Sequence, residues 1–238
     1  MTSPVATSHA QLPVGDAEHM ARMDRIYRVV RHVYDASRKF FLLGRDDAIR
    51  AIPEDAQTIV EIGCGTARNL IKIASLRPSA QLFGVDASRE MLATAEASVA
   101  RHLPGRRVAL RAGLAEDLDP HATFGRAEPF DVALFSYSLS MMPTWRDALD
   151  AAVRSVKPGG TIIIVDFWDQ AGCPRAFRRL LTWWIAKFGV FHRPELLERV
   201  NQLERDGICR VQIRGVLGRY AWIGVLSDVL PRNVSSAG

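Results

Sequence analysis

The chain has 238 residues, of which 48% are apolar and 24% charged, and its formal net charge is +5. This length and composition suit one α/β domain with a sizeable core and a helical addition. No apolar run reaches membrane-spanning length, and residues 1–7 lack a basic segment followed by an apolar one, so we expect neither a transmembrane helix nor a signal peptide. Cys64, Cys173 and Cys209 are odd in number and show no metal-ligand spacing. We therefore expect a cytoplasmic protein without a metal site, in which the cysteines are small buried side chains.

The first part of the chain precedes the predicted core. Residues 1–16 and 232–238 are polar and are expected to be tails. Between Met20 and Phe41, apolar residues recur at helical spacing and arginines occupy the other positions. This pattern predicts one or two helices within residues 17–52 that cover a site on the following domain.

Apolar, β-branched runs alternate with helical stretches along the rest of the chain. The alternation predicts a mainly parallel, Rossmann-like sheet with helices on both faces. Two late runs separated by Leu217 and Gly218 predict a C-terminal antiparallel hairpin. We expect this α/β domain to span residues 53–231, with a helical insertion at 172–205. The expected strands are residues 58–62, 82–86, 107–112, 130–136, 160–167, 210–216 and 219–226, and the clearest helix is 145–156.

A glycine-containing turn follows the first predicted strand. Residues 60–69 read Val-Glu-Ile-Gly-Cys-Gly-Thr-Ala-Arg-Asn, and helical spacing resumes after them. Gly63 and Gly65 therefore stand where a strand meets a helix, so that a ligand can touch the backbone and the helix N-terminus can face an anion. A dinucleotide fingerprint would need a small residue at position 68, where this chain has Arg68. Glu61 is also better placed for a cationic amine than for a pyrophosphate.

The pattern Glu-x-Gly-x-Gly resembles motif I of the class I S-adenosylmethionine-dependent methyltransferases, with Ala67 where many members have a third glycine. Asp86 ends the next predicted strand about 20 residues later, at the distance where a carboxylate reaches ribose hydroxyls; capping a helix is its alternative role. The segment after it resembles the family's Asp-x-Ser-x-x-Met-Leu, which places Ala87 and Met91 near adenine. S-Adenosylmethionine is the cofactor that these motifs imply.

Further cofactor contacts are expected after the third and fourth strands. Many relatives have Gly-Asp-Ala after the third strand, whereas residues 113–117 here read Gly-Leu-Ala-Glu-Asp. The expected aspartate is missing, so we assign Ala115 and Glu116 in its place. Cys64 in the glycine turn and Ser136 at the end of the fourth strand complete the predicted cofactor site.

Three further segments resemble a narrower family, the diacylglyceryl-homoserine N-methyltransferases, which make the betaine lipid diacylglyceryl-trimethylhomoserine. The segments are residues 34–46, 136–143 and 165–167, and the similarity runs from about residue 23 to 226. The resemblance implies successive methylation of the amino group of a lipid head group.

Such a reaction needs an aligned, uncharged amine and a group that accepts its proton. Aromatic rings can hold increasingly methylated nitrogen by cation–π attraction. Tyr137 and Trp168 follow strand ends, and Tyr34 belongs to the segment before the core, so these rings are our candidates, with core packing as the alternative. Asp166 ends a strand and is predicted to orient or deprotonate the amine, or else to cap a loop.

Two basic features bear on the substrate. Arg45 follows Gly44 and is predicted to bind a carboxylate of the head group or of the cofactor, or to be a surface residue. Residues 174–190 combine an apolar, tryptophan-containing helical face with basic flanks, a pattern typical of helices at membrane interfaces and also of helices packed on a sheet. With the positive net charge, this pattern favours peripheral contact with an anionic membrane surface, on the inner face of the membrane.

Other functions remain open at this stage. Nucleic acid is not expected as a partner, because base amino-group methyltransferases usually have an Asn- or Asp-Pro-Pro-aromatic segment where this chain has Ser136 to Leu139. A lipid-surface protein with a vestigial cofactor fold is disfavoured by the complete acidic and glycine motif. Phosphatidylethanolamine, another amino lipid or a quinone precursor is an alternative acceptor.

Overall fold

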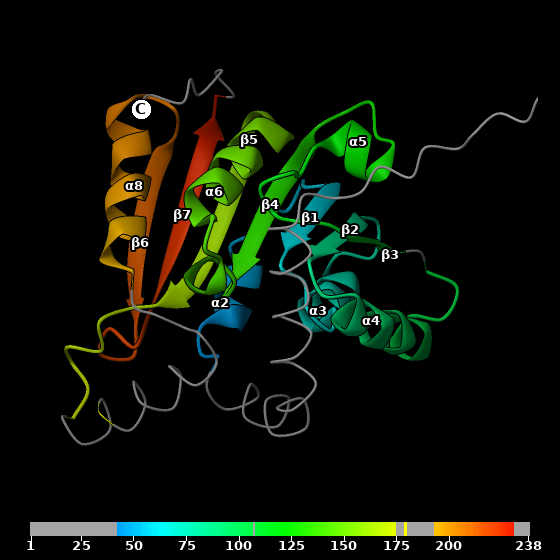
Figure 1. The fold of residues 1–238 in the computed structure, drawn as a ribbon, viewed down its shortest axis with the longest axis horizontal. Helices are drawn as coiled ribbons and strands as arrows, with labels where there is room; N and C mark the ends of the chain where they lie inside the picture. Colours follow the sequence, from blue (N-terminus) through cyan, green and yellow to red (C-terminus); the bar gives the residue numbers. More distant parts are fainter. Residues whose placement is uncertain (1–41, 107, 175–178, 180–192, 231–238) are drawn as a thin grey trace, which may run out of the picture.

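The computed structural model of the chain describes residues 42–106, 108–174, 179 and 193–230. Within these residues, seven strands form one sheet in the order β3-β2-β1-β4-β5-β7-β6 (Figure 1). Neighbouring strands from β3 to β5 pair in parallel, and β7 pairs antiparallel with both β5 and β6. The predicted Rossmann-like fold with a C-terminal antiparallel hairpin is therefore confirmed. The strands are β1 (Thr58–Ile62), β2 (Gln81–Asp86), β3 (Val108–Ala112), β4 (Phe130–Ser136), β5 (Val156–Phe167), β6 (Arg210–Val216) and β7 (Ala221–Val229).

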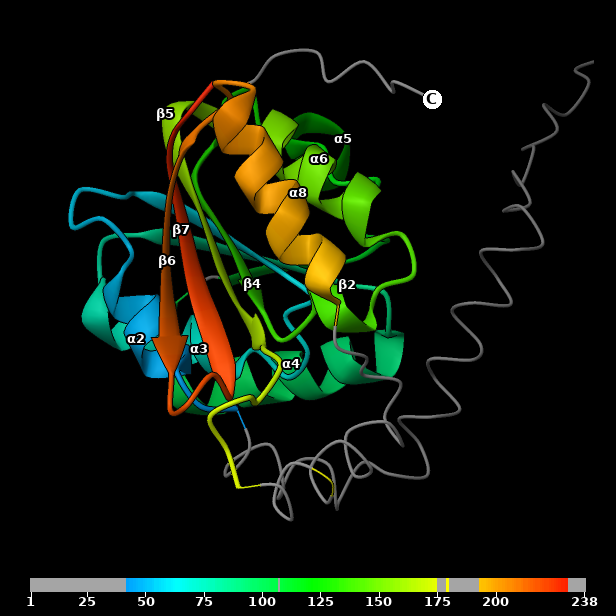
Figure 2. The same ribbon diagram turned by 90° about the vertical axis from the view of Figure 1, so that its left-hand side faces the viewer.

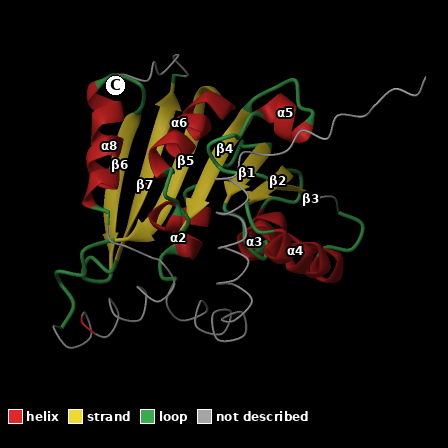
Figure 3. Ribbon diagram, in the orientation of Figure 1, coloured by secondary structure: helices red, strands yellow, loops and turns green. Residues whose placement is uncertain are grey.

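Helices cover both faces of this sheet, as the alternation of elements predicted. One apolar core joins the sheet to α2, α3 and α4, and a second joins the opposite face to α6 and α8. Figure 2 shows these two layers on either side of the strands, and Figure 3 shows helices and strands alternating along the chain. The helices are α2 (Arg45–Arg50), α3 (Arg68–Leu76), α4 (Arg89–His102), α5 (Pro120–Phe124), the 3₁₀ turn η1 (Leu139–Met141), α6 (Trp145–Ser155) and α8 (Pro194–Arg205).

Element boundaries differ from prediction mainly near glycine and proline. Strand β5 begins at Val156 rather than Gly160, because Val156 pairs with Phe130 before a shift in register. The sequence Pro-Gly-Gly at residues 158–160 indicated a turn, and it forms the irregular part of this strand instead. Strand β7 begins at Ala221, two residues later than predicted.

Two predicted regions fall outside the described residues. They are the helical region before residue 42, which contains Tyr34, and nearly all of the amphipathic segment 174–190. Within the described part of the chain, no helix is long and apolar enough to cross a membrane. Two of the predicted buried cysteines, Cys64 and Cys209, are buried, and Cys173 is partly exposed.

The strand order locates the natural binding site of the sheet. From β1, the chain first builds outward through β2 and β3, then returns to place β4 on the other side of β1. Ligands of open α/β sheets bind beyond the carboxyl ends of the strands at such a reversal. The loops after β1 and β4, which contain Gly63 and Tyr137, therefore flank the expected crevice.

Candidate active site

The turn after β1 is held tightly against β2. The backbone N–H groups of Gly63 and Cys64 both donate to the carbonyl of Val85, at 2.8 and 3.1 Å. Gly63 has a φ of 75°, and a Cβ at this position would lie 2.6 Å from the Cβ of Ser138. A side chain would therefore strain the backbone and collide with the loop after β4.

Asp86, at the end of β2, fixes the other side of the same turn. Its carboxylate accepts hydrogen bonds from the N–H of Gly65 at 2.7 Å and from that of Ser88 at 2.9 Å. The hydroxyl of Ser88 in turn caps α4 by accepting from the N–H of Met91. The acid predicted to bind ribose thus also sets the shape of the glycine turn.

These elements enclose a cavity that we call the glycine-turn pocket. Its wall includes most of the residues predicted to bind the cofactor: Gly63, Gly65, Asp86, Ala87, Met91, Ala115 and Glu116. Tyr137, which was predicted to contact the acceptor, also lines the pocket. The other wall residues were not predicted from the sequence: Val85, Gly113, Leu114, Ser138, Met141, Met142, Pro143 and Thr144. The carboxylate of Glu116 accepts a hydrogen bond from the Thr144 hydroxyl at 2.7 Å, so one hydrogen bond joins two sides of the pocket.

A second cavity, the polar chamber, contacts the other residues of the same turn. Glu61 is only 2% exposed there, and its carboxylate accepts a hydrogen bond from the Asn69 side chain at 2.6 Å. Cys64 and Ser136, both predicted cofactor contacts, also line this chamber rather than the glycine-turn pocket. Its wall consists of Leu42, Arg45, Glu61, Cys64, Thr66, Arg68, Asn69 and Ser136.

Tyr137 lines the glycine-turn pocket, but most of its ring is buried. It has a φ of 56°, and its hydroxyl donates to the carbonyl of Leu43 at 2.5 Å. The ring packs edge-on against Phe167, 4.7 Å between centroids. Burial raises the pKa of the Tyr137 hydroxyl well above its usual value, with the charges of Tyr220 and Asp166 acting in the same direction. This hydroxyl is therefore a proton donor that holds the segment before α2, and contact of its ring with an acceptor amine stays a prediction.

Asp166 is buried behind the pocket wall. Its two oxygens accept from the N–H groups of Ser140 and Phe167, at 2.9 and 2.8 Å. Burial raises its pKa to about 6, against the lowering effect of these hydrogen bonds and of the Arg193 charge. Arg193 itself donates to the carbonyl of Ser140 at 3.2 Å. Asp166 thus holds η1, which carries Met141 into the pocket wall, while its predicted direct role in proton transfer remains untested.

The third candidate ring lies elsewhere. The ring of Trp168 packs 3.2 Å from the position that a Cβ on Gly215 would occupy, and the guanidinium of Arg219 stacks over it at 4.6 Å. Trp168 belongs to neither cavity wall, so core packing describes it better than contact with the acceptor.

The residues that the sequence did not assign are those whose roles depend on folding. Asn69 lies eight positions after Glu61 and meets it because α3 folds back over β1. Met141 and Met142 reach the pocket because η1 is held by Asp166, which is remote in sequence. The acidic residue near the end of β1 could have suggested a polar partner in the first turn of α3, whereas the methionines carry no comparable signal.

Together, the fold and the site define an α/β domain with a cavity at the reversal of strand order, where such sheets bind their ligands. Residues 60–162, fewer than half of the chain, match the model of a family described as methyltransferase domain. The chain is 32% identical to a trans-aconitate 2-methyltransferase from Streptomyces avermitilis over 56% of its own length and 46% of the relative. It is 30% identical to a demethylmenaquinone methyltransferase from Desulfitobacterium hafniense over 51% of its length and 47% of the relative.

A similar fold occurs in the plantazolicin methyltransferase BpumL, solved with S-adenosylhomocysteine, at a TM-score of 0.64 and 13% identity. That alignment covers 92% of this chain and all of the other. The comparisons thus agree with the predicted class in two respects: part of the chain matches a methyltransferase domain, and the fold is similar to that of solved methyltransferases. The chain spans about half the length of the curated relatives it matches, so its acceptor remains to be argued from its own residues.

Proposed function

We propose that the protein methylates the amino group of diacylglyceryl-homoserine successively, giving the trimethylated betaine lipid. One observation carries the proposal: the three segments that resemble the diacylglyceryl-homoserine N-methyltransferases meet at one place in the fold. The described part of the first segment is held by the hydrogen bond from Tyr137 to the Leu43 carbonyl. The third segment is joined to the second by bonds from the Tyr137 N–H to the Val165 carbonyl and from the Ser140 N–H to Asp166. The three segments are thus in mutual contact beside the glycine-turn pocket, which supports the proposal.

The cofactor fits the residues that are present. The bare backbone at Gly63 leaves a surface that any side chain would fill, and the adjacent Asp86 carboxylate lines the same pocket. In our proposal, Asp86 holds the ribose, and Met91, Ala115 and Glu116 surround the adenine, as the sequence suggested. When bound, S-adenosylmethionine supplies a methyl group on a sulfonium, which is already a strong electrophile.

The protein therefore mainly orients the acceptor and excludes water. Met141, Met142 and Pro143 give the glycine-turn pocket an apolar wall beside the cofactor residues. Methionine side chains adapt to ligands of varied shape, which suits an amine that gains bulk with each methyl group. In this proposal Asp166 keeps that wall in place from behind, and the proton of the amine leaves before each transfer because only the uncharged nitrogen has a lone pair to donate.

The same apolar wall also suits a quinone precursor, and a demethylmenaquinone methyltransferase is among the relatives. Phosphatidylethanolamine and other amino lipids remain alternatives of the same chemical type. Purified protein can be given S-adenosylmethionine and vesicles that contain diacylglyceryl-homoserine, phosphatidylethanolamine or a demethylated quinone. We expect products with one, two and three added methyl groups only from the homoserine lipid. Methylation of the quinone alone would replace the proposal with carbon methylation.

Access to such a lipid requires a membrane surface. We propose that residues 174–190 provide it, through their apolar face and basic flanks. Sedimentation with anionic vesicles tests this proposal on Trp184→Glu and on the double variant Arg178→Glu/Arg179→Glu. We expect both to bind vesicles less than the unmodified protein, and equal binding by all three would assign membrane contact to another surface.

A further inference from the structure

The 3₁₀ turn η1 brings the methionines to the glycine-turn pocket, but it is too short to fix its own position. Two internal backbone bonds, donated by the N–H groups of Met141 and Met142 at 3.1 and 3.2 Å, close the turn. A single 3₁₀ turn has poorer hydrogen-bond geometry than an α-helix, and a structure of this length is marginal in isolation. The place of the two methionines therefore depends on contacts between η1 and other elements.

Two oppositely charged side chains hold Ser140, the middle residue of this turn. Its N–H donates to the carboxylate of Asp166 at 2.9 Å, and its carbonyl accepts from the Nε of Arg193 at 3.2 Å. Hydrogen bonds to charged groups are stronger than those between neutral groups. Burial raises the pKa of Asp166, and the charge of Arg193 acts against this rise, so Arg193 also favours the ionised carboxylate that accepts from Ser140. The two contacts thus support each other.

The helix that follows Arg193 does not explain why an arginine stands there. Arg193 is the N-cap residue of α8, a position where Ser, Thr, Asp and Asn are favoured and where the helix dipole opposes a positive charge. Its side chain caps no backbone group of the helix, and Pro194 at the first helical position already suits a helix start. A residue that breaks a local rule in this way is expected to serve a site elsewhere in the fold.

Helix α8 gives Arg193 a fixed support. Arg199 of this helix pairs with Asp150 of α6 at 2.7 Å, and Figure 2 shows the two helices on the same face of the sheet. Because α8 cannot shift without breaking these contacts, Arg193 holds Ser140 at a fixed place relative to the sheet. The inner face of α8 is buried in the apolar core that also contains α6, through Leu196, Val200 and Leu203.

We propose that Arg193 is a positioning residue for the methyl acceptor, which acts by holding η1 and with it the pocket wall formed by Met141, Met142 and Pro143. This wall lies in the same cavity as Asp86 of the proposed cofactor site, so its place decides where an acceptor atom can meet the methyl group. A misplacement of about 1 Å can lower the rate of a reaction by about 100-fold. The inference rests on the proposed role of this wall in binding the acceptor, but not on which lipid the acceptor is.

Nuclear magnetic resonance of isotope-labelled methionine methyl groups tests this role without any methyl acceptor. The spectra are recorded with and without S-adenosylhomocysteine. We expect Arg193→Gln to shift or broaden the signals of Met141 and Met142, because η1 loses one of its two charged supports. The signal of Met91 should stay unchanged, since Met91 lines the same pocket from α4. Arg193→Lys keeps the charge and an N–H donor, and should restore most of the original spectrum.

Arg199→Gln is the matched control, and kinetics relate the wall to the reaction. Arg199 is also a partly buried arginine of α8, but it pairs with Asp150 instead of η1, so its substitution should leave the methionine signals in place. On vesicles that contain diacylglyceryl-homoserine, Arg193→Gln should lower kcat/KM for the lipid by about 10- to 100-fold. The affinity for S-adenosylhomocysteine should stay within about twofold of that of the unmodified protein. Arg199→Gln should change neither quantity.

Unchanged signals of Met141 and Met142 in Arg193→Gln would overturn the proposal. The same changes in Arg199→Gln would also overturn it, because they would show that any weakening of α8 disturbs the pocket. A loss of affinity for S-adenosylhomocysteine as large as the loss of kcat/KM would assign Arg193 to the cofactor site instead. If the unmodified protein methylates none of the tested lipids, the proposed function fails, and the methionine signals alone decide whether Arg193 positions the wall.

Discussion

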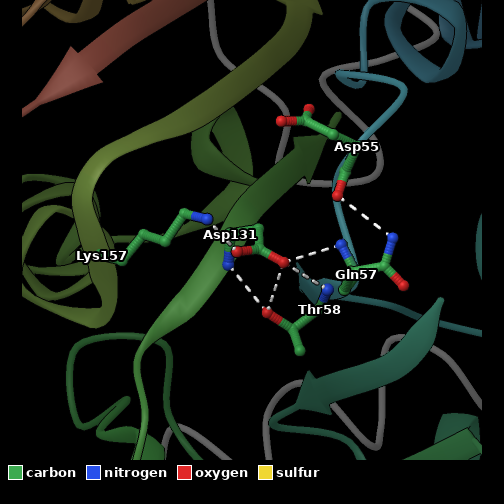
Figure 4. Close-up of polar contacts among 5 residues, drawn as sticks. All are labelled: Asp55, Gln57, Thr58, Asp131 and Lys157. Carbon is green, nitrogen blue, oxygen red and sulfur yellow. Dashed lines mark hydrogen bonds and ion pairs between the residues drawn. The ribbon is translucent and has the colours of Figure 1, made fainter.

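At the amino-terminal edge of the parallel strands, the protein itself satisfies the carboxylate of Asp131. One oxygen accepts from the N–H groups of Gln57 and Thr58, both at 2.7 Å, and from the Thr58 hydroxyl at 3.0 Å (Figure 4). The other oxygen pairs with the ammonium of Lys157 at 2.6 Å. Burial alone would raise the pKa of Asp131, but these contacts outweigh it and hold the pKa below its usual value.

The acids at the carboxyl-terminal edge of the parallel strands have different partners. Asp86 accepts two backbone hydrogen bonds and also lines a pocket. Asp166 is enclosed and held by neutral N–H donors, and its pKa is about 6 because burial outweighs them. Tight pairing with a cation thus joins β1, β4 and β5 where the sheet needs only stability. At the opposite edge, where sheets of this kind bind their ligands, the buried Asp166 keeps a raised pKa, as is typical of groups near functional sites.

The largest effect is expected for a substitution of Gly63, at the carboxyl-terminal edge of the parallel strands. Gly63→Val should weaken S-adenosylmethionine binding by more than about 100-fold, because the new Cβ would lie within 2.6 Å of Ser138 and the φ of 75° would be strained. Calorimetry measures the affinity. Gly105→Val is a matched control: its φ is 78°, but a Cβ there meets nothing within 4 Å. Similar losses of affinity in both variants would show that strain alone, rather than the tight turn, accounts for the effect.

At the opposite edge, stability rather than binding should change. Asp131→Ala should lower the free energy of unfolding by about 2 to 3 kcal/mol, because it removes a charged acceptor from two backbone N–H groups and from Lys157. Urea denaturation gives this value, and cofactor affinity of the folded variant should be unchanged. Asp55→Ala removes a neighbouring exposed carboxylate and should cost less than about 0.5 kcal/mol. A loss of cofactor binding in folded Asp131→Ala would contradict the assignment of stability to this edge and of ligand binding to the other.

The two acids should also give opposite pH dependences of stability. The folded-state pKa of Asp166, about 6, lies above the unfolded value near 4, so its contribution is full below about pH 4 and is lost as pH rises through 6. The pKa of Asp131 is lowered, so its contribution is present above about pH 4 and is lost as pH falls through the folded pKa. Urea denaturation across this range should show that Asp166→Asn removes a decline of about 3 kcal/mol and that Asp131→Asn removes a rise. The same slope in all three proteins would refute the assignment.

The sequence predicted the residues at the carboxyl-terminal edge of the parallel strands better than those at the amino-terminal edge. Glu61, the two glycines and Asp86 form a local pattern, because the turn after a strand must be bare and the next strand must end in an acid. The structure brings all four to the same turn, where Asp86 bonds the N–H of Gly65. Asp131 carried no such signal, since its partners Thr58 and Lys157 come from two other strands. Its role depends on strand pairing across more than 70 residues, which no local spacing encodes.

The same reasoning explains why acceptor residues were harder to predict than cofactor residues. Tyr137 was chosen for its place after a strand, and it does line the pocket. The direction of its hydroxyl depends on Leu43, which is 94 residues away in the sequence. It also depends on the left-handed backbone conformation of Tyr137 itself, which no sequence pattern predicted. The identity of a residue at a strand end is therefore easier to predict than the use of its side chain.

The smallest expected effect separates the ring of Tyr137 from its hydroxyl. Tyr137→Phe keeps the contact with Phe167 but removes the hydrogen bond to the Leu43 carbonyl, which should cost about 1 kcal/mol of stability. Because that bond ties Leu43, just before α2, to a residue of the pocket wall, turnover should fall a few-fold while binding of S-adenosylhomocysteine stays nearly constant. Tyr137→Ala, which also removes the ring, should reduce turnover much further if the ring shapes the acceptor site. Steady-state kinetics on vesicles measure the turnover, and urea denaturation measures the free energy of unfolding. If the two variants lost the same turnover, the hydroxyl and its bond to Leu43 would account for the whole role of Tyr137, and the aromatic contact with the acceptor amine would be wrong.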